Sequence, residues 1–83
     1  MKALVYVTYK SGVLDPQGKA VRGGLGSLGF QEVAGVRQGK YFELELEEKD
    51  PKKARTRVEE MCKKLLANPV MEDFRIEIAG EGT

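Results

Sequence analysis

Alternation of residue types near the start of the chain predicts a β-strand over residues 3–9. Ala3, Val5 and Val7 fall on one face of this strand, while Leu4 and Tyr6 fall on the other. Both faces are largely apolar, and a strand of this kind is usually covered on both sides.

Three further segments predict strands. Residues 40–48 are the clearest, because apolar side chains alternate there with glutamates. Residues 73–79 alternate in the same way, and residues 31–37 predict a more modest strand with Gly35 as a bulge. Gln38-Gly39 predicts a two-residue hairpin between the second and third strands.

Two Asp-Pro pairs predict helix starts, because Asp accepts bonds from free backbone N–H groups and Pro has no N–H to leave unpaired. The first helix begins at Asp15 and ends before Gly29. Its interior glycines each cost about 1 kcal/mol relative to Ala, so packing must hold it. The second helix runs from Asp50 to about Ala67, and residues 80–83 predict a frayed tail.

These elements follow the order β-α-β-β-α-β, and residues 1–83 are too few for more than one domain. Two right-handed βαβ crossovers joined by a hairpin predict a ferredoxin-like α+β fold. Its four-stranded antiparallel sheet carries both helices on one face. A chain of this size buries only about 60–65% of its unfolded surface, so we expect oligomerisation to help stabilise it.

Composition removes most of the common catalytic chemistries. The chain contains no His, one Cys and no Trp. Histidine-based triads, histidine metal ligands and thiolate-rich zinc sites are therefore excluded. Fourteen Lys and Arg against thirteen Asp and Glu leave a net charge of +1, which argues against a polyanion-binding protein. Carboxylate chemistry, lysine chemistry, backbone anion binding or no chemistry remain open.

The same features indicate a compartment. Residues 1–7 hold no apolar stretch of signal-peptide length, and no window approaches the roughly 18 apolar residues of a membrane span. A lone cysteine suits a reducing environment. We therefore expect a cytoplasmic protein.

Three motif-like features favour structural roles. Residues 24–29 match G-x-G-x-x-G, but that dinucleotide pattern must open a helix, and here it closes one. Glu43, Glu45 and Glu47 form a carboxylate row that could bind a cation or act as acid and base. A solvated strand face is favoured, with docking of a basic partner as the main alternative. Cys62 falls on an apolar helix stripe, which predicts a buried, inert thiol.

RNA-recognition domains share this order of elements, but they carry basic and aromatic residues on the open sheet face. Glutamates occupy that face in the third strand here and repel phosphate. We therefore expect no nucleic-acid partner.

Residues 10–18, which join the first strand to the first helix, are the most distinctive segment. Val13 and Leu14 are apolar in a loop, where solvent exposure is the norm. Two interpretations stay open with equal weight. The loop packs into the chain's own core, or it packs on a partner.

Four stretches resemble the PurS family, the small subunits of multi-subunit phosphoribosylformylglycinamidine synthase. In order along the chain they read GVLDPQGKA (12–20), SLGF (27–30), VRQGK (36–40) and EMCKKLLANPVMEDF (60–74). Together they are specific, since they span nearly the whole chain. Relatives usually have stronger helix formers than residues 23–26, a difference that concerns the length and rigidity of the first helix.

The resemblance implies a PurS-like fold and an assembly role. The family's complex makes formylglycinamidine ribonucleotide in de novo purine synthesis, with ATP, Mg and glutamine-derived ammonia. A large subunit holds the synthetase site and a glutaminase subunit releases ammonia. PurS is implied to dimerise and bridge these two partners, without catalytic, cofactor-binding or metal-binding residues of its own. The missing histidines agree with such a role.

We therefore expect a non-catalytic bridging subunit whose open sheet face is buried in a homodimer or higher homo-oligomer. An alternative with the same strand order is an ACT-type regulatory domain that binds a small amino acid near the first loop. An acylphosphatase-like enzyme needs a catalytic Arg in that loop, which offers only Lys10. The residues expected to face partner subunits are Lys10, Gly12, Val13, Leu14, Asp15, Gln17, Arg37 and Lys40.

Overall fold

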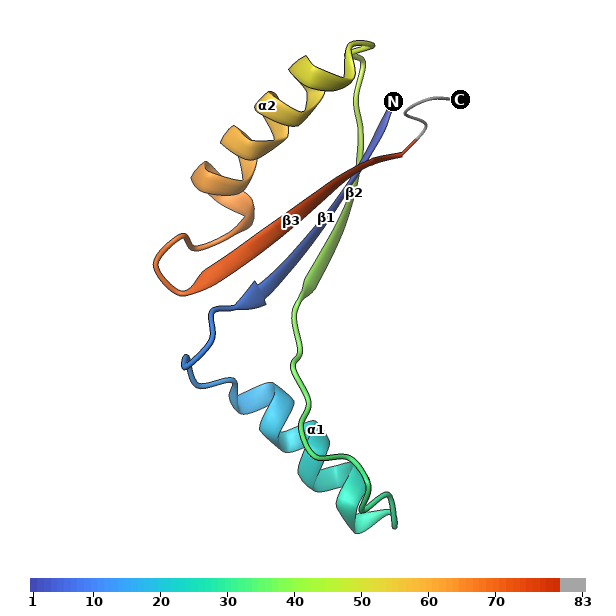
Figure 1. The fold of residues 1–83 in the computed structure, drawn as a ribbon, viewed down its shortest axis with the longest axis vertical. Coiled ribbons are helices and arrows are strands. Elements are labelled where there is room, and N and C mark those ends of the chain that lie inside the picture. Colours follow the sequence, from blue (N-terminus) through green and yellow to red (C-terminus); the bar gives the residue numbers. More distant parts are fainter. Residues whose placement is uncertain (80–83) are drawn as a thin grey trace.

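The computed structural model describes residues 1–79, which form a sheet, a covering helix and a projecting arm (Figure 1). The elements in chain order are β1 (Lys2–Tyr9), α1 (Pro16–Ser27), β2 (Lys40–Glu45), α2 (Pro51–Met61), a π-helical turn η1 (Cys62–Leu66) and β3 (Glu72–Ala79). The tail predicted for residues 80–83 lies outside the described part. No helix within residues 1–79 is long and apolar enough to cross a membrane.

The sheet has the strand order β2-β1-β3, and both neighbouring pairs are antiparallel. Val5 lies at its centre, opposite Phe42 on one side and Ile76 on the other. The predicted α+β class is confirmed, whereas the predicted four-stranded sheet is not, because the described residues form a three-stranded sheet. Residues 31–37 run extended beside α1 and pair with no strand.

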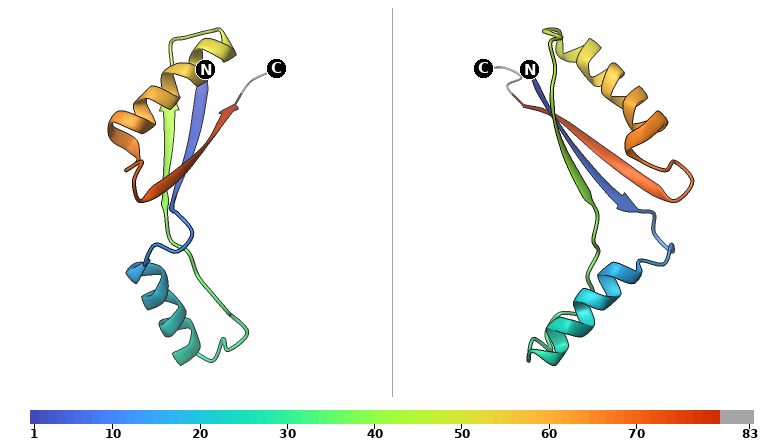
Figure 2. Two further views of the ribbon diagram at one scale, coloured as in Figure 1. Left: turned by 60° about the vertical axis from the view of Figure 1, so that its left-hand side comes forward. Right: turned by 180° about the vertical axis from the view of Figure 1, so that it is seen from behind.

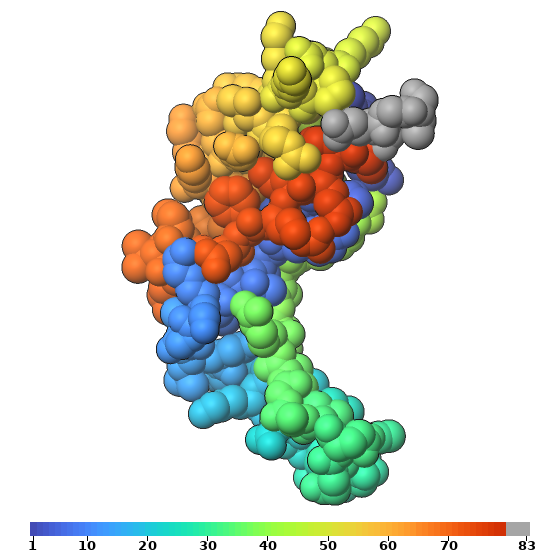
Figure 3. Space-filling view, in the orientation of Figure 1, coloured from blue at the N-terminus to red at the C-terminus, as the bar shows by residue number. Residues whose placement is uncertain are grey.

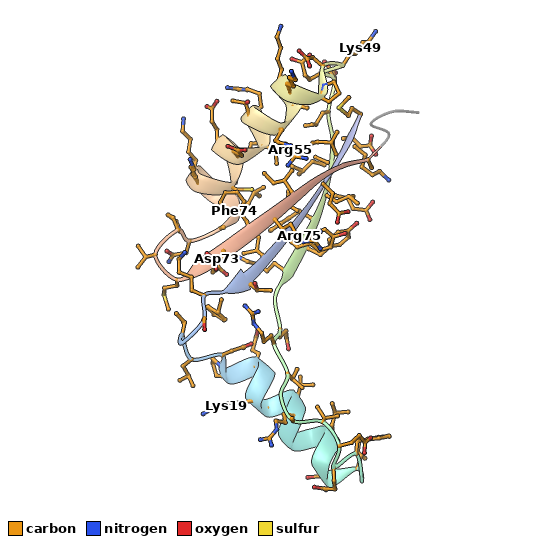
Figure 4. All side chains as sticks on the ribbon, viewed as in Figure 1. Lys19, Lys49, Arg55, Asp73, Phe74 and Arg75 are labelled. Atoms are coloured by element: carbon orange, nitrogen blue, oxygen red, sulfur yellow. The ribbon has the colours of Figure 1, made fainter. Side chains whose placement is uncertain are left out.

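One face of the sheet is covered by α2, and the core lies between them (Figure 2). Each fully buried Val in this layer contributes about 1.5–3 kcal/mol relative to an exposed one. Figure 4 shows the alternation along β3, where Phe74 lies on the α2 side and Arg75 on the opposite side. The buried core residues are Ala3, Val5, Val7, Ala54, Val58, Cys62, Ala67 and Ile78.

The other face of the sheet, here called the open face, has no covering helix within residues 1–79. The prediction that both helices share one face is not confirmed, because α1 lies beyond the end of the sheet and not beside α2 (Figure 1). Strand alternation nevertheless places Leu4 and Tyr6 on the open face, as the sequence predicts. The complete open face consists of Lys2, Leu4, Tyr6 and Thr8 of β1, Tyr41, Glu43 and Glu45 of β2, and Asp73, Arg75, Glu77 and Ala79 of β3.

Residues 16–39, here called the arm, project from the end of the sheet (Figure 3). The arm contains α1 and the extended segment that returns along it. It gives the molecule extents of 47 × 30 × 15 Å. The predicted hairpin at Gln38-Gly39 is absent, because the segment before it is not a strand. The expected bulge at Gly35 is also absent, because Gly35 does not lie in a strand.

Both predicted helix starts are confirmed. The carboxylate of Asp15 accepts from the N–H of Gly18 at 2.9 Å, and that of Asp50 accepts from the N–H of Lys52 at 3.0 Å. After α1, Gly29 takes the left-handed backbone conformation with φ +100°, and the N–H of Phe30 reaches the carbonyl of Leu25 at 2.9 Å. This Schellman arrangement ends the helix where the sequence predicts.

The two edges of the sheet differ. Met1 and Leu46 form two backbone hydrogen bonds with each other, of 2.7 and 2.9 Å. In an antiparallel sheet the bonded residues alternate, so the odd-numbered residues of β1 bond to β2 and the even-numbered residues bond to β3. Because the backbone groups of Ile76 are not those that bond to β1, its carbonyl points outward from β3, and Arg55 donates to it at 3.1 Å. The edge of β3 thus carries a side-chain cap, which blunts strand pairing there.

Candidate partner-binding site

The connection between β1 and α1 begins with a tight turn. The N–H of Val13 donates to the carbonyl of Lys10 at 3.1 Å, and Gly12 between them has φ +86°. A residue with a side chain adopts that conformation only at a cost, so the turn requires Gly at this position. The turn directs the chain away from the sheet and into the arm.

Asp15 ties the two halves of the arm together. One carboxylate oxygen caps α1 at Gly18, while the other accepts from the N–H of Gln38 at 2.9 Å. The backbone N–H groups of Gln38 and Gly18, in that order, hold the pKa of Asp15 below its usual range. The same carboxylate therefore starts the helix and anchors the end of the returning segment.

Arg37 ties the arm to the sheet. Its guanidinium donates to the carbonyl of Tyr9 at 2.6 Å and to the hydroxyl of Thr8 at 3.1 Å. Both acceptors lie at the end of β1. A planar guanidinium with several donors can make both bonds at once.

Two glycines let the backbones meet at this junction. A Cβ on Gly18 would lie 2.5 Å from the carbonyl oxygen of Val36, and a Cβ on Gly39 would overlap the carbonyl oxygen of Val7. Neither glycine has a positive φ, so close approach is what requires them. Gly39, which the sequence assigns to a turn, is instead a crossing point.

These contacts enclose a shallow hollow between the end of β1, the loop and the base of α1. Val13 is half-buried there, whereas the side chain of Leu14 is 64% exposed. Val13 therefore fits the interpretation in which the loop packs into the chain's own core, and Leu14 fits the one in which it packs on a partner. The hollow is lined by Tyr9, Lys10, Ser11, Gly12, Val13, Leu14, Asp15, Lys19, Val36 and Arg37.

The structure gathers six of the eight predicted partner-facing residues around this hollow. Gln17 lies beside it and accepts a bond from the side chain of Gln38 at 3.2 Å. Lys40 lies elsewhere, because its ammonium donates to the carbonyl of Leu66 at 3.2 Å and to Glu72 at 3.4 Å. It joins β2 to the segment after η1 and does not line the hollow.

Two apolar residues next to the loop were not predicted to face a partner. Val70 and Met71 are 79% and 43% exposed, and the carbonyl of Met71 accepts from the N–H of Lys10 at 2.8 Å. The ammonium of Lys10 also pairs with Asp73 at 2.6 Å. Apolar residues directly after the Asn-Pro stop were the signal, since they repeat the pattern that marked the first loop.

The open face is a second surface without a covering layer. Tyr6 and Tyr41 pack with ring centroids 5.1 Å apart, and the guanidinium of Arg75 lies 4.2 Å from the centroid of Tyr6. Lys2 pairs with Glu43 at 3.2 Å, and this hydrogen bond and charge raise the pKa of Lys2. Partial burial, followed by the charge of Glu43, raises the pKa of Tyr41.

The geometry offers little for catalysis. Within the described part, no group of three or more His, Cys, Asp or Glu residues is arranged to hold a metal. The glycine motif at residues 24–29 lies at the end of α1, as the sequence predicts, and so lacks the helix start that a pyrophosphate needs. Cys62 is fully buried, and burial raises the pKa of its thiol.

Fold and surfaces together define a small α+β subunit built for contacts with other proteins. The PurS family model, described as phosphoribosylformylglycinamidine (FGAM) synthase, matches residues 2–80. The chain belongs to the PurS family. It is 52% identical over 77 residues to phosphoribosylformylglycinamidine synthase subunit PurS of Bacillus subtilis, covering 93% of this chain and 90% of the relative. The corresponding Methanocaldococcus jannaschii subunit is 43% identical and is covered to 93%, as is this chain.

Solved structures of the family have the same fold. M. jannaschii PurS, one of the subunits of formylglycinamide ribonucleotide amidotransferase, superposes with a TM-score of 0.83 at 43% identity, over 92% of both chains. A chain in the structure of PurLQS from Thermotoga maritima also gives a TM-score of 0.83, at 34% identity, over 92% of this chain and 93% of that one. The similarity therefore includes a PurS chain solved within an assembly.

Proposed function

We propose that this chain is the PurS subunit of phosphoribosylformylglycinamidine synthase and works in purine biosynthesis as part of a complex. The observation that carries the proposal is the 52% identity to the B. subtilis subunit over most of both chains. Similarity to a chain of the T. maritima PurLQS structure supports membership of such a complex. The relatives described above give no support to the ACT-type alternative.

Its role is to bridge the synthetase and glutaminase subunits and to support ammonia transfer between them. The hollow at the base of the arm favours contact with a partner subunit, because the apolar side chain of Leu14 is exposed there. ATP, Mg and glutamine then belong to the other subunits, and the chain works in the cytoplasm where they act. The hollow is the surface proposed for a partner subunit, through Lys10, Gly12, Val13, Leu14, Asp15 and Arg37.

The chain also forms a homodimer or higher homo-oligomer. Leu4 and Tyr6 on the open face favour this, because partly apolar strand residues gain from being covered. Sedimentation of the isolated chain at micromolar concentration tests it. A folded monomer across that range contradicts the homodimer.

Reconstitution tests the bridging role. Glutamine-dependent and ammonia-dependent synthesis are each measured with the synthetase and glutaminase subunits, in the presence and absence of this chain. We expect omission to remove the glutamine-dependent rate and to leave the ammonia-dependent rate largely intact. Equal glutamine-dependent rates with and without the chain would sink the proposed role.

A further inference from the structure

Two loops meet at the end of the sheet from which the arm leaves. One is the loop of residues 10–14 after β1, and the other is the loop of residues 67–71 before β3. The backbone N–H of Lys10 donates to the carbonyl of Met71 at 2.8 Å, and the ammonium of Lys10 pairs with Asp73 at 2.6 Å. Figures 1 and 2 show the two loops side by side. Lys10 therefore holds together two segments that lie far apart in the sequence.

The second loop has a fixed conformation, because Asn68 bonds to three of the residues that follow it. Its side-chain oxygen accepts from the N–H of Val70 at 3.0 Å, and its backbone carbonyl accepts from the N–H groups of Met71 and Glu72 at 3.1 and 2.7 Å. Pro69 fixes its own backbone angle φ. A loop that is ordered before binding loses little conformational entropy when a partner covers it.

Apolar side chains of both loops are exposed to solvent. The exposed fractions of Leu14, Val70 and Met71 are 64%, 79% and 43%. Single exposed apolar residues are ordinary on a protein surface, but neighbours on ordered loops are typical of a contact surface. Lys10 lines the hollow and is bonded to Met71, so the hollow and residues 68–71 form one surface, here called the two-loop surface.

The charges of the two-loop surface favour an acidic partner. Its carboxylates are already bonded, because Asp73 pairs with Lys10 and both oxygens of Asp15 accept backbone N–H groups. Lys19, whose side chain projects from the start of α1 (Figure 4), forms no ion pair within residues 1–79. Arg37 makes both of its bonds to β1 through one terminal nitrogen, Nη2, so its other N–H groups remain available. Two cations can therefore receive a carboxylate from a partner.

We propose that the two-loop surface binds one segment of a partner subunit, which carries an exposed apolar side chain flanked by a carboxylate. The apolar side chain packs against Leu14, Val70 and Met71, and the hollow beside them has a volume of about 520 Å³. The carboxylate pairs with Lys19 or Arg37 at the rim. This inference rests on the proposed function and adds the second loop and the chemistry of the partner.

Binding of the full chain to each partner subunit tests the proposal. The synthetase and glutaminase subunits are titrated, separately and together, with the wild-type chain, with Leu14→Asp and with Val70→Asp. Thr56→Asp is the matched control, because Thr56 is exposed on α2, resembles valine in shape and lies outside both loops. We expect each loop variant to weaken binding to the same subunit by at least about tenfold. The control should change the dissociation constant by less than about twofold.

Four results overturn the proposal. If Val70→Asp binds as the control does while Leu14→Asp binds weakly, the second loop lies outside the contact, whereas the hollow and the proposed function stand. If the two variants lose binding to different subunits, the loops make two separate contacts. If Val70→Asp alters the monomer–dimer equilibrium in sedimentation, the surface belongs to a second copy of the chain. If the wild-type chain binds neither subunit, the proposed function fails as well.

Folding of the variants is checked by thermal scans. Val70 is 79% exposed, so Val70→Asp should remain folded. Val70→Thr, which keeps the shape of the side chain and adds only a hydroxyl, repeats the measurement with a smaller expected loss of about threefold. Unchanged binding by Val70→Thr overturns the apolar contact even if Val70→Asp unfolds.

A charge reversal tests the basic rim. Lys19→Glu should weaken binding by about tenfold at about 0.05 M salt, and the loss should shrink at about 0.5 M because salt screens exposed charges. Lys53→Glu is the control, since Lys53 is exposed on α2 and its substitution makes the same change of net charge. Equal dissociation constants for the two variants overturn the acidic chemistry proposed for the partner.

Discussion

The carboxylate of Asp15 holds the backbone N–H of Gln38 at 2.9 Å across 23 residues of sequence. Since its other oxygen caps α1, a single side chain fixes both where the helix starts and where the returning segment ends. The orientation of the arm therefore depends on a few bonds at its base. The helix itself contacts the sheet little.

We predict that Asp15→Asn lowers the melting temperature at pH 7, because the amide is a weaker acceptor and turns a donor toward one N–H. The folded pKa of Asp15 is lowered, so its ionised form stabilises the fold above the unfolded pKa of about 3.9. That contribution is lost as pH falls through the folded pKa. Thermal scans should show a constant difference from pH 7 to about 5 that narrows below about pH 4. A difference independent of pH contradicts this assignment.

Gly18→Ala should destabilise the chain by about 1–3 kcal/mol, because its Cβ would lie 2.5 Å from the carbonyl oxygen of Val36. Gly23→Ala is the matched control on the same helix. A Cβ there meets nothing within 4 Å, so the substitution should stabilise α1 by up to about 1 kcal/mol. Urea unfolding of the two variants should move in opposite directions. Shifts of the same sign show that Gly18 is not a close-approach position.

Arg37→Ala should loosen the arm without unfolding the sheet. It removes the bonds to the carbonyl of Tyr9 and the hydroxyl of Thr8, which join the arm to β1. Hydrogen exchange should accelerate in residues 16–36 and stay unchanged in β1 and β3. Arg57→Ala, which removes only a surface pair with Glu60, should leave both regions unchanged.

Cys62→Ser should destabilise the chain by about 1–3 kcal/mol, because it places a hydroxyl in a fully buried apolar position. Cys62→Ala tests the volume change without the polar group. The wild-type thiol, whose pKa is raised by burial, should react with a thiol reagent only on unfolding. Rapid native labelling contradicts the position of Cys62 in the core.

Leu14→Asp should lower the glutamine-dependent rate of the reconstituted complex while leaving the isolated chain stable to within about 0.5 kcal/mol. The side chain is 64% exposed and lies in the hollow proposed for a partner subunit. Leu65→Asp is the control: Leu65 is 83% exposed but lies on η1, outside that hollow. Equal rates for the two variants remove the hollow as a contact surface.

Local signals in the sequence are the ones that predict this structure well. The Asp-Pro helix starts depend on bonds within three residues, and the strand pattern around Phe42 depends on alternation alone. Residues 31–37 were also predicted as a strand, but whether such a segment joins a sheet depends on a distant partner. Here the close packing of Val36 on Gly18 keeps the segment beside α1.

In the candidate site, too, the parts that depend on local signals were predicted and those that depend on long-range contacts were not. Val13 and Leu14, which are unusual in a loop because they are apolar, lie on one side of the hollow. Val70 and Met71 belong to the same end of the sheet only through the bond between Lys10 and Met71, a contact that spans most of the chain. Lys40 was predicted to face a partner together with the loop residues, but it does not line the hollow, because its ammonium bonds to the carbonyl of Leu66.

The guanidinium of Arg55 on the outer carbonyl of Ile76 limits how this protein can assemble. A sheet that extends from chain to chain needs unpaired backbone N–H and C=O groups at both edges of every molecule. Since Arg55 occupies one outward carbonyl of β3, that edge is a poorer template for a further strand than the edge of β2. Pairing from chain to chain is therefore disfavoured at β3.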